Sequence, residues 1–188
     1  ASLAEGRISV FTDLSPSAYI APVTFFSFYE SPDDFTNRVI VGSFYKSPEL
    51  YLTYGGTTKS KYDLSDNAMR FFYDLFEDYY LTFSQDFSEN KMNNFATQNM
   101  ERLKNYREYG GWKTIKSIMD MADPNDFKNV YNTVKKYSLI REYDRNGFPA
   151  DKILSHKKFQ YLTPNDIYRL MRSKADKINT EINVIDEP

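Results

Sequence analysis

Lysine and arginine alternate with aromatic residues in the last third of the chain, and this combination is suited to binding phosphates. Cationic side chains neutralise phosphates and release counterions, while aromatic rings stack on nucleobases. A solvated helix surface beside core aromatics gives the same composition, so both interpretations stay open at this point. The predicted nucleic-acid-binding residues are Lys135, Lys136, Arg141, Arg145, Lys157, Lys158, Arg169 and Arg172.

Residues suited to catalysis are few. His156 is the only histidine and stands beside two lysines, as a surface imidazole does. The acid pairs Asp33–Asp34 and Glu77–Asp78, with the segment 144–146, suggest a small Mg²⁺ nuclease, which needs carboxylates converging on paired metal ions. Adjacent acids on one element point in different directions, however. We therefore expect no catalytic residue, no metal, no cofactor and no small-molecule ligand.

The charge is unevenly distributed along the chain, although the formal net charge is only -2. Residues 1–100 hold 7 Lys and Arg against 13 Asp and Glu, whereas residues 101–177 hold 17 against 10. The chain has no cysteine, which excludes disulfides and thiolate metal sites. No apolar run approaches the ~18 residues of a membrane-spanning helix. We expect a cytoplasmic protein without a membrane partner.

The elements that must position these residues divide into a β-rich start and a helical remainder, so the predicted fold class is α+β. Segments 7–12, 23–29 and 38–45 are rich in β-branched and aromatic residues, which favours strands. From residue 65 the apolar residues recur at helical spacing. We predict a β-rich segment at 1–64 and a helical segment at 65–188, within one compact domain.

Helices are predicted from Ser65 to Phe83, near 90–107, around 115–119 and after Asp123. The last helix has the clearest start, because Thr163 can cap it, Pro164 fits its first position and Asp166 places negative charge in its first turn. Its apolar stripe consists of Ile167, Leu170, Met171, Ala175, Ile178 and Ile182.

Residues 123–188 resemble the end of the β2 lobe, before the fork region, of the β subunit of multi-subunit RNA polymerases. Ser138 replaces the acid of the family's Tyr-Asp-Leu motif, and either Arg141 or Arg145 stands for the arginine of its basic segment. The remaining matches are Leu154, the helix start Leu162-Thr163-Pro164-Asn165-Asp166-Ile167 and the acidic turn Val184-Ile185-Asp186.

This resemblance implies a non-catalytic, lobe-like part of a DNA-directed RNA polymerase, similar to the split β subunits of giant bacteriophages. Its implied partners are the other polymerase subunits and DNA, which it would hold through phosphate contacts, in the host cytoplasm or a virion. Two other functions stay open: a phage virion or scaffold protein, and the Mg²⁺ nuclease. The aromatic content of 17% fits either a large interface or the codon usage of an AT-rich genome.

Overall fold

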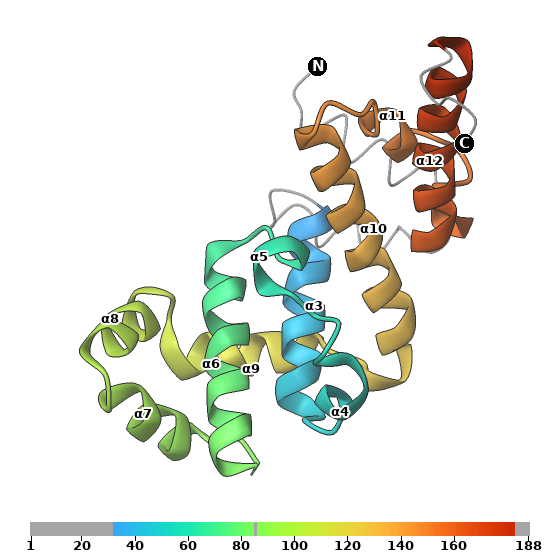
Figure 1. The fold of residues 1–188 in the computed structure, drawn as a ribbon. Helices are drawn as coiled ribbons and strands as arrows, with labels where there is room; N and C mark the ends of the chain where they lie inside the picture. Colours follow the sequence, from blue (N-terminus) through green and yellow to red (C-terminus); the bar gives the residue numbers. More distant parts are fainter. Residues whose placement is uncertain (1–31, 85, 183–188) are drawn as a thin grey trace, which may run out of the picture. The chain divides into compact units, whose positions relative to one another are not determined.

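The computed structural model describes residues 32–84 and 86–182, and all the regular structure within those ranges is helical (Figure 1). The predicted α+β class is therefore wrong, since the described part of the chain is all-α. The strands predicted at 7–12 and 23–29 lie outside the described residues. The strand predicted at 38–45 falls inside helix α3 (Pro32–Lys46).

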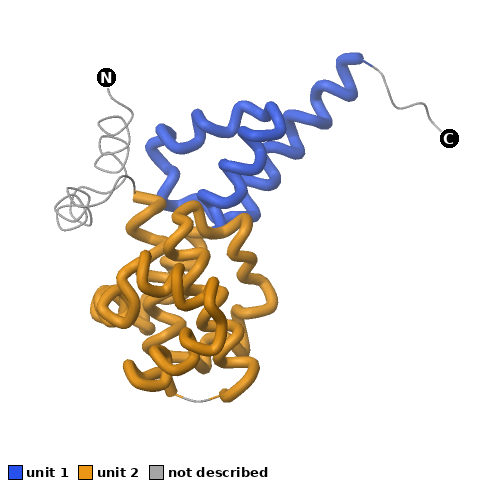
Figure 2. The backbone as a smooth tube through the Cα atoms, turned by 90° about the vertical axis from the view of Figure 1, so that its left-hand side faces the viewer, with its two compact units in different colours: residues 1–28, 135–188 blue, residues 29–134 orange. Residues whose placement is uncertain are grey.

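The chain divides into two compact units, which Figure 2 draws in different colours. Unit 2 is Tyr29–Val134, and unit 1 combines Ala1–Phe28 with Lys135–Pro188, of which the structure describes 135–182. Helix α10 (Phe127–Arg145) contributes its first turns to unit 2 and the rest to unit 1. The other helices of unit 2 are α3, α4 (Leu50–Tyr54), α5 (Ser60–Asp63), α6 (Asn67–Phe83), α7 (Glu89–Thr97), α8 (Met100–Glu108), α9 (Gly111–Met121) and the 3-10 helix η1 (Pro124–Asp126).

Helix α3 is buried on most of its sides, which explains why its sequence has the pattern of a strand. A helix enclosed by other elements needs apolar side chains all round, and periodicity cannot distinguish such a run from a buried strand. The start signals are nevertheless present: Pro32 occupies the first helical position and Asp33 lies in the first turn. Gly42 marks a close approach to α9, because a Cβ there would lie 1.8 Å from the carbonyl oxygen of Ile118.

Helix α6 has the amphipathic pattern that its sequence predicts. Its N-cap is Asp66 rather than the predicted Ser65, since the Asp66 carboxylate accepts a hydrogen bond from the Ala68 N–H at 2.8 Å. Its inward rings pack against other aromatics, and the Phe76 ring lies 4.9 Å from that of Phe87 between centroids. Its buried residues are Met69, Phe72, Tyr73, Leu75, Phe76 and Tyr79. Much of the aromatic content of the chain therefore packs in the core of unit 2.

The helix predicted near 90–107 is two helices, α7 and α8. They are separated at Asn99, whose side-chain oxygen accepts a hydrogen bond from the Arg102 N–H at 2.9 Å and so caps α8. Helices α8 and α9 are separated at Gly110–Gly111, where both glycines have positive φ, 96° and 57°.

Unit 1 contains, after α10, the short helix α11 (Asp151–Leu154), the 3-10 helix η2 (Phe159–Tyr161) and α12 (Pro164–Ile182). The predicted start of α12 is confirmed. The Thr163 hydroxyl accepts from the Asp166 N–H at 3.1 Å, and the Asp166 carboxylate accepts from the Thr163 N–H at 2.8 Å. This reciprocal pair is a capping box. None of the helices in the described ranges has the length and apolar character that crossing a membrane requires.

Candidate functional site

The four predicted binding residues on α10 do not form a cationic surface together. Lys136 is only 4% exposed: its Nζ donates to the Phe159 carbonyl at 2.8 Å and lies 4.3 Å from the centroid of that ring. Burial lowers the pKa of Lys136 to about 8, and the buried Nζ, engaged by the Phe159 carbonyl, is not accessible to a phosphate. Lys135 and Arg141 are half-buried and have partners of their own, and Arg145 pairs with Glu142.

The two predicted arginines on α12 are exposed and engaged by neighbours on the same helix. Arg172 lies 3.8 Å from the Asp176 carboxylate. The Asn165 side-chain amide is oriented so that its oxygen accepts hydrogen bonds from two guanidinium nitrogens of Arg169, at 3.2 and 3.3 Å. These four residues follow one another at three- and four-residue spacing, so they share one side of the helix.

A groove lies between α11 and α12, on another side of α12. Its first hollow has a volume of about 320 Å³. Ile153 and Met171 are 9% and 2% exposed and form its floor, whereas Leu170 is 43% exposed. The residues that line it are Pro149, Lys152, Ile153, His156, Leu162, Leu170, Met171 and Lys174. We call this hollow and its continuation along α12 the α11–α12 groove.

The continuation is a second hollow of about 490 Å³ that shares Pro149 and Lys174 with the first. Its residues are Asn146, Gly147, Phe148, Pro149, Lys174, Ala175, Lys177, Ile178 and Glu181. Gly147 has a φ of 86° and follows the end of α10, a position where the left-handed conformation favours glycine. The Phe148 N–H then donates to the Tyr143 carbonyl at 2.9 Å, which fixes the chain as it turns into the groove wall.

Most of the charge around the α11–α12 groove is positive. Lys152, Lys174 and Lys177 line it, and Glu181 is the one acid among its lining residues. Two predicted residues, Lys157 and Lys158, are exposed and directly follow His156, whose Nδ1 accepts from the Lys158 N–H at 3.1 Å. Residues 135–182 hold 11 Lys and Arg against 6 Asp and Glu, whereas residues 32–134 hold 12 against 15.

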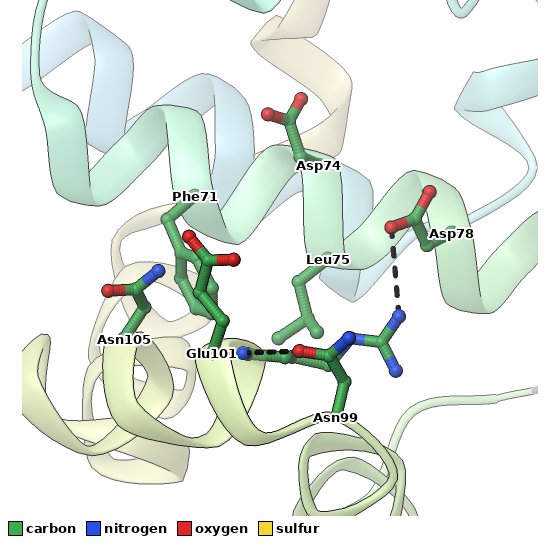
Figure 3. A pocket seen from close by; sticks show the side chains of 8 residues that line it. Phe71, Asp74, Leu75, Asp78, Asn99, Glu101 and Asn105 are labelled. Atoms are coloured by element: carbon green, nitrogen blue, oxygen red, sulfur yellow. Dashed lines mark hydrogen bonds and ion pairs between the residues drawn. The ribbon is translucent and has the colours of Figure 1, made fainter.

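Unit 2 has a different hollow, of about 240 Å³, between α6 and α8 (Figure 3). Asp74, Asp78 and Glu101 line it, together with Arg102, which lies 4.0 Å from the Asp78 carboxylate. Burial raises the pKa of Asp74. No group of three or more His, Cys, Asp or Glu residues in the described part of the chain is placed to hold a metal ion.

The acid pair Asp33–Asp34 lies at the start of α3, where Asp34 takes part in an ion-pair network with Arg38 and Asp66. The Arg38 guanidinium lies 3.6 Å from the Asp34 carboxylate and 3.1 Å from that of Asp66. Burial, followed by a hydrogen bond with Asp66, raises the pKa of Asp34 to about 6. These contacts fasten the start of α3 to the N-cap of α6.

Comparison with known proteins gives one similarity, at the N-terminal end. The family model of the Bacillus/Clostridium GerA spore germination protein matches residues 1–52. The match covers less than a third of the 188 residues, and its described part is α3 with the first residues of α4. No curated protein and no solved structure matches the chain.

This match contradicts the resemblance of residues 123–188 to the RNA polymerase β lobe, because the family similarity of the chain lies at its other end. The best-matching motif, Leu162–Ile167, has a local explanation. It is a capping box, which starts helices in unrelated proteins. The acidic turn 184–186 lies outside the described residues. The predicted resemblance to the RNA polymerase β lobe is therefore wrong.

The groove and the residues Lys152, Lys174 and Lys177 beside it were not predicted from the sequence. One signal was present. The apolar stripe of α12 spans 16 residues, from Ile167 to Ile182, whereas the preceding segment 146–162 offers only short elements to cover it. Because the stripe is longer than the elements that pack on it, part of its apolar face stays exposed. Ile178 and Ile182, for example, are 54% and 66% exposed.

Proposed function

We propose that the protein is a non-catalytic docking module that holds an apolar helix of a partner protein in the α11–α12 groove. One observation carries the proposal: the apolar stripe of α12 is only partly covered. Ile167 and Met171 are at most 2% exposed, whereas Leu170 and Ile178, which line the two hollows, are 43% and 54% exposed, and Ile182 further along the helix is 66% exposed. Figure 1 shows α11 lying alongside α12.

The lining of the groove favours a helix over a nucleic acid. Its apolar residues are chiefly aliphatic, and Ile153, Leu162, Leu170 and Met171 offer no ring on which a base could stack. An amphipathic helix instead lays an apolar face into such a groove at i, i+4 and i+7. Complete burial of one Leu or Ile side chain contributes about 1.5–3 kcal/mol, so three of them can drive a reversible association.

The similarity of residues 1–52 to the GerA spore germination protein supports a setting for this module. We include in the proposal that its partner belongs to spore germination. Co-expression with a GerA-type germination protein tests this: recovery of both chains in one complex supports the setting. Separate elution of the two chains would refute the proposed role in spore germination, but it would not contradict the docking function of the groove.

Nucleic acid is the competing occupant, because Lys157 and Lys158 are exposed near Tyr161, which is 73% exposed. Phosphate contacts would give affinity that falls steeply with salt, whereas apolar docking is nearly independent of salt. A salt titration therefore distinguishes the two interpretations, because only nucleic-acid binding should weaken steeply.

The test uses the full chain and a labelled peptide of about 14 residues, with leucines at helical anchor spacing and glutamines elsewhere. We expect saturable binding by fluorescence anisotropy that persists at high salt. Leu170→Asp should weaken it at least about tenfold, which corresponds to 1.4 kcal/mol. The matched control is Leu81→Asp on α6, where the leucine is 64% exposed and outside the groove. Salt-sensitive binding of a DNA oligonucleotide without peptide binding overturns the proposal.

A further inference from the structure

We propose that the occupant of the α11–α12 groove is an acidic amphipathic helix, with Asp or Glu flanking its apolar anchors. This inference rests on the docking function proposed above and specifies the chemistry of the partner. It is carried by three features of the groove: its length, the sign of its charges and the aliphatic character of its lining.

The length of the groove suits about three turns of helix. The two hollows meet at Pro149 and Lys174, and together they follow α12 from Leu170 to Glu181. At 1.5 Å per residue this span is roughly 16 Å. A partner helix of that length presents three or four side chains to the groove, enough to cover Leu170 and Ile178.

The charges that line the groove are three lysines and one acid, Glu181, so they are net positive. Within residues 32–84 and 86–182, neither Lys152, Lys174 nor Lys177 makes an ion pair, although all three are exposed. The arginines on the other side of α12 are engaged by Asn165 and Asp176. Lys152, Lys174 and Lys177 outnumber Glu181 in the lining of the groove, so an approaching carboxylate would meet net positive charge there.

The same charges disfavour a second copy of this chain as the occupant. Two α12 helices packed through Leu170 and Ile178 would bring Lys174 and Lys177 of both copies together, and like charges at close range oppose docking. The positive charge of the lysines along the groove thus favours a partner with negative charge. The aliphatic lining of the groove selects a helix rather than bases.

The experiment compares three labelled peptides that share the same leucine anchors and differ only in having Glu, Gln or Lys at the other positions. Anisotropy titrations use the full chain at low and moderate salt. We expect the Glu peptide to bind at least about tenfold more tightly than the Lys peptide, with the Gln peptide between them. The double variant Lys152→Glu/Lys174→Glu should invert that order.

The matched control is Lys128→Glu, an exposed lysine of unit 2, which should leave the order unchanged. Equal binding of all three peptides overturns the acidic preference while the docking function stands. Failure of all three to bind overturns the docking function itself. Concentration-dependent dimers in sedimentation velocity that Leu170→Asp abolishes, or a DNA oligonucleotide that displaces the Glu peptide, would each overturn the inference in favour of another occupant.

Discussion

Replacing Gly42 with alanine tests the close packing of α3 on α9 in unit 2. Gly42 lies within α3, where it faces the backbone of α9. Alanine has the higher helix propensity by about 1 kcal/mol, so local structure alone predicts that Gly42→Ala stabilises the protein. The packing predicts the opposite sign, which makes the substitution decisive.

The magnitude follows from the position of the new methyl group. A Cβ at residue 42 would lie 1.8 Å from the Ile118 carbonyl oxygen and 2.3 Å from its carbonyl carbon. Ordinary van der Waals contact begins near 3.4 Å, and a backbone carbonyl cannot rotate aside as a side chain can. The helices must therefore separate by more than an ångström and open the packing around Ile115 and Phe44. Overpacking of this kind typically costs 1–3 kcal/mol, and we expect a net loss of about 3 kcal/mol because the obstacle is backbone.

Urea denaturation followed by far-ultraviolet circular dichroism measures this loss. The control is Gly56→Ala, because a Cβ at that exposed turn position meets nothing within 4 Å. We expect the control to stay within about 0.5 kcal/mol of the parent protein. If Gly42→Ala proves as stable as the parent or more stable, the close packing of α3 on α9 is refuted.

Three further predictions concern single positions. Burial raises the pKa of Asp34 from 3.8 to about 6, so its stabilising contribution is complete below pH 3.8 and is lost as the pH rises through about 6. The full shift corresponds to about 3 kcal/mol, and discounting it for solvent screening leaves about 2 kcal/mol, so Asp34→Asn should remove a decline of that size from pH-dependent urea titrations. Burial lowers the pKa of Lys136 to about 8, so between about pH 8 and 10 the unfolded chain binds more protons than the folded one and the parent protein should gain stability as the pH rises. A Lys136→Met variant should lack this gain, and an equal gain in the variant would contradict the burial of Lys136. Thr163→Val removes the cap of α12 at a cost of about 1 kcal/mol, and hydrogen exchange should quicken in its first turn alone.

The sequence predicted helices well where they are amphipathic and poorly where they are buried all round. The stripe of α6 and the capping box at Thr163 were readable, because one face is polar and the cap chemistry is local. The run at 38–45 has the pattern of a strand because enclosure of the helix on several sides removes its helical periodicity. Pro32 and Asp33 are the start signals of α3, but proline and aspartate are equally common in turns, so they do not distinguish a helix start from a turn.

The candidate site was less accessible to sequence reasoning, because composition counts charges without assigning them to faces. Lys135 and Lys136 are neighbours, yet one is half-buried and the other 4% exposed. Lys174 and Arg172 are two residues apart on one helix, and only the lysine lines the groove. The groove itself depends on α11 and α12 meeting, which local sequence does not encode.

The docking function is tested most directly by methyl NMR spectroscopy of the full chain, labelled at Ile, Leu and Met and titrated with the Glu peptide. We expect saturable shifts at Ile153, Leu170, Met171 and Ile178, with the methyl groups of Leu81 unmoved. Shifts confined to unit 2, or none at peptide concentrations far above the micromolar range, would contradict the account.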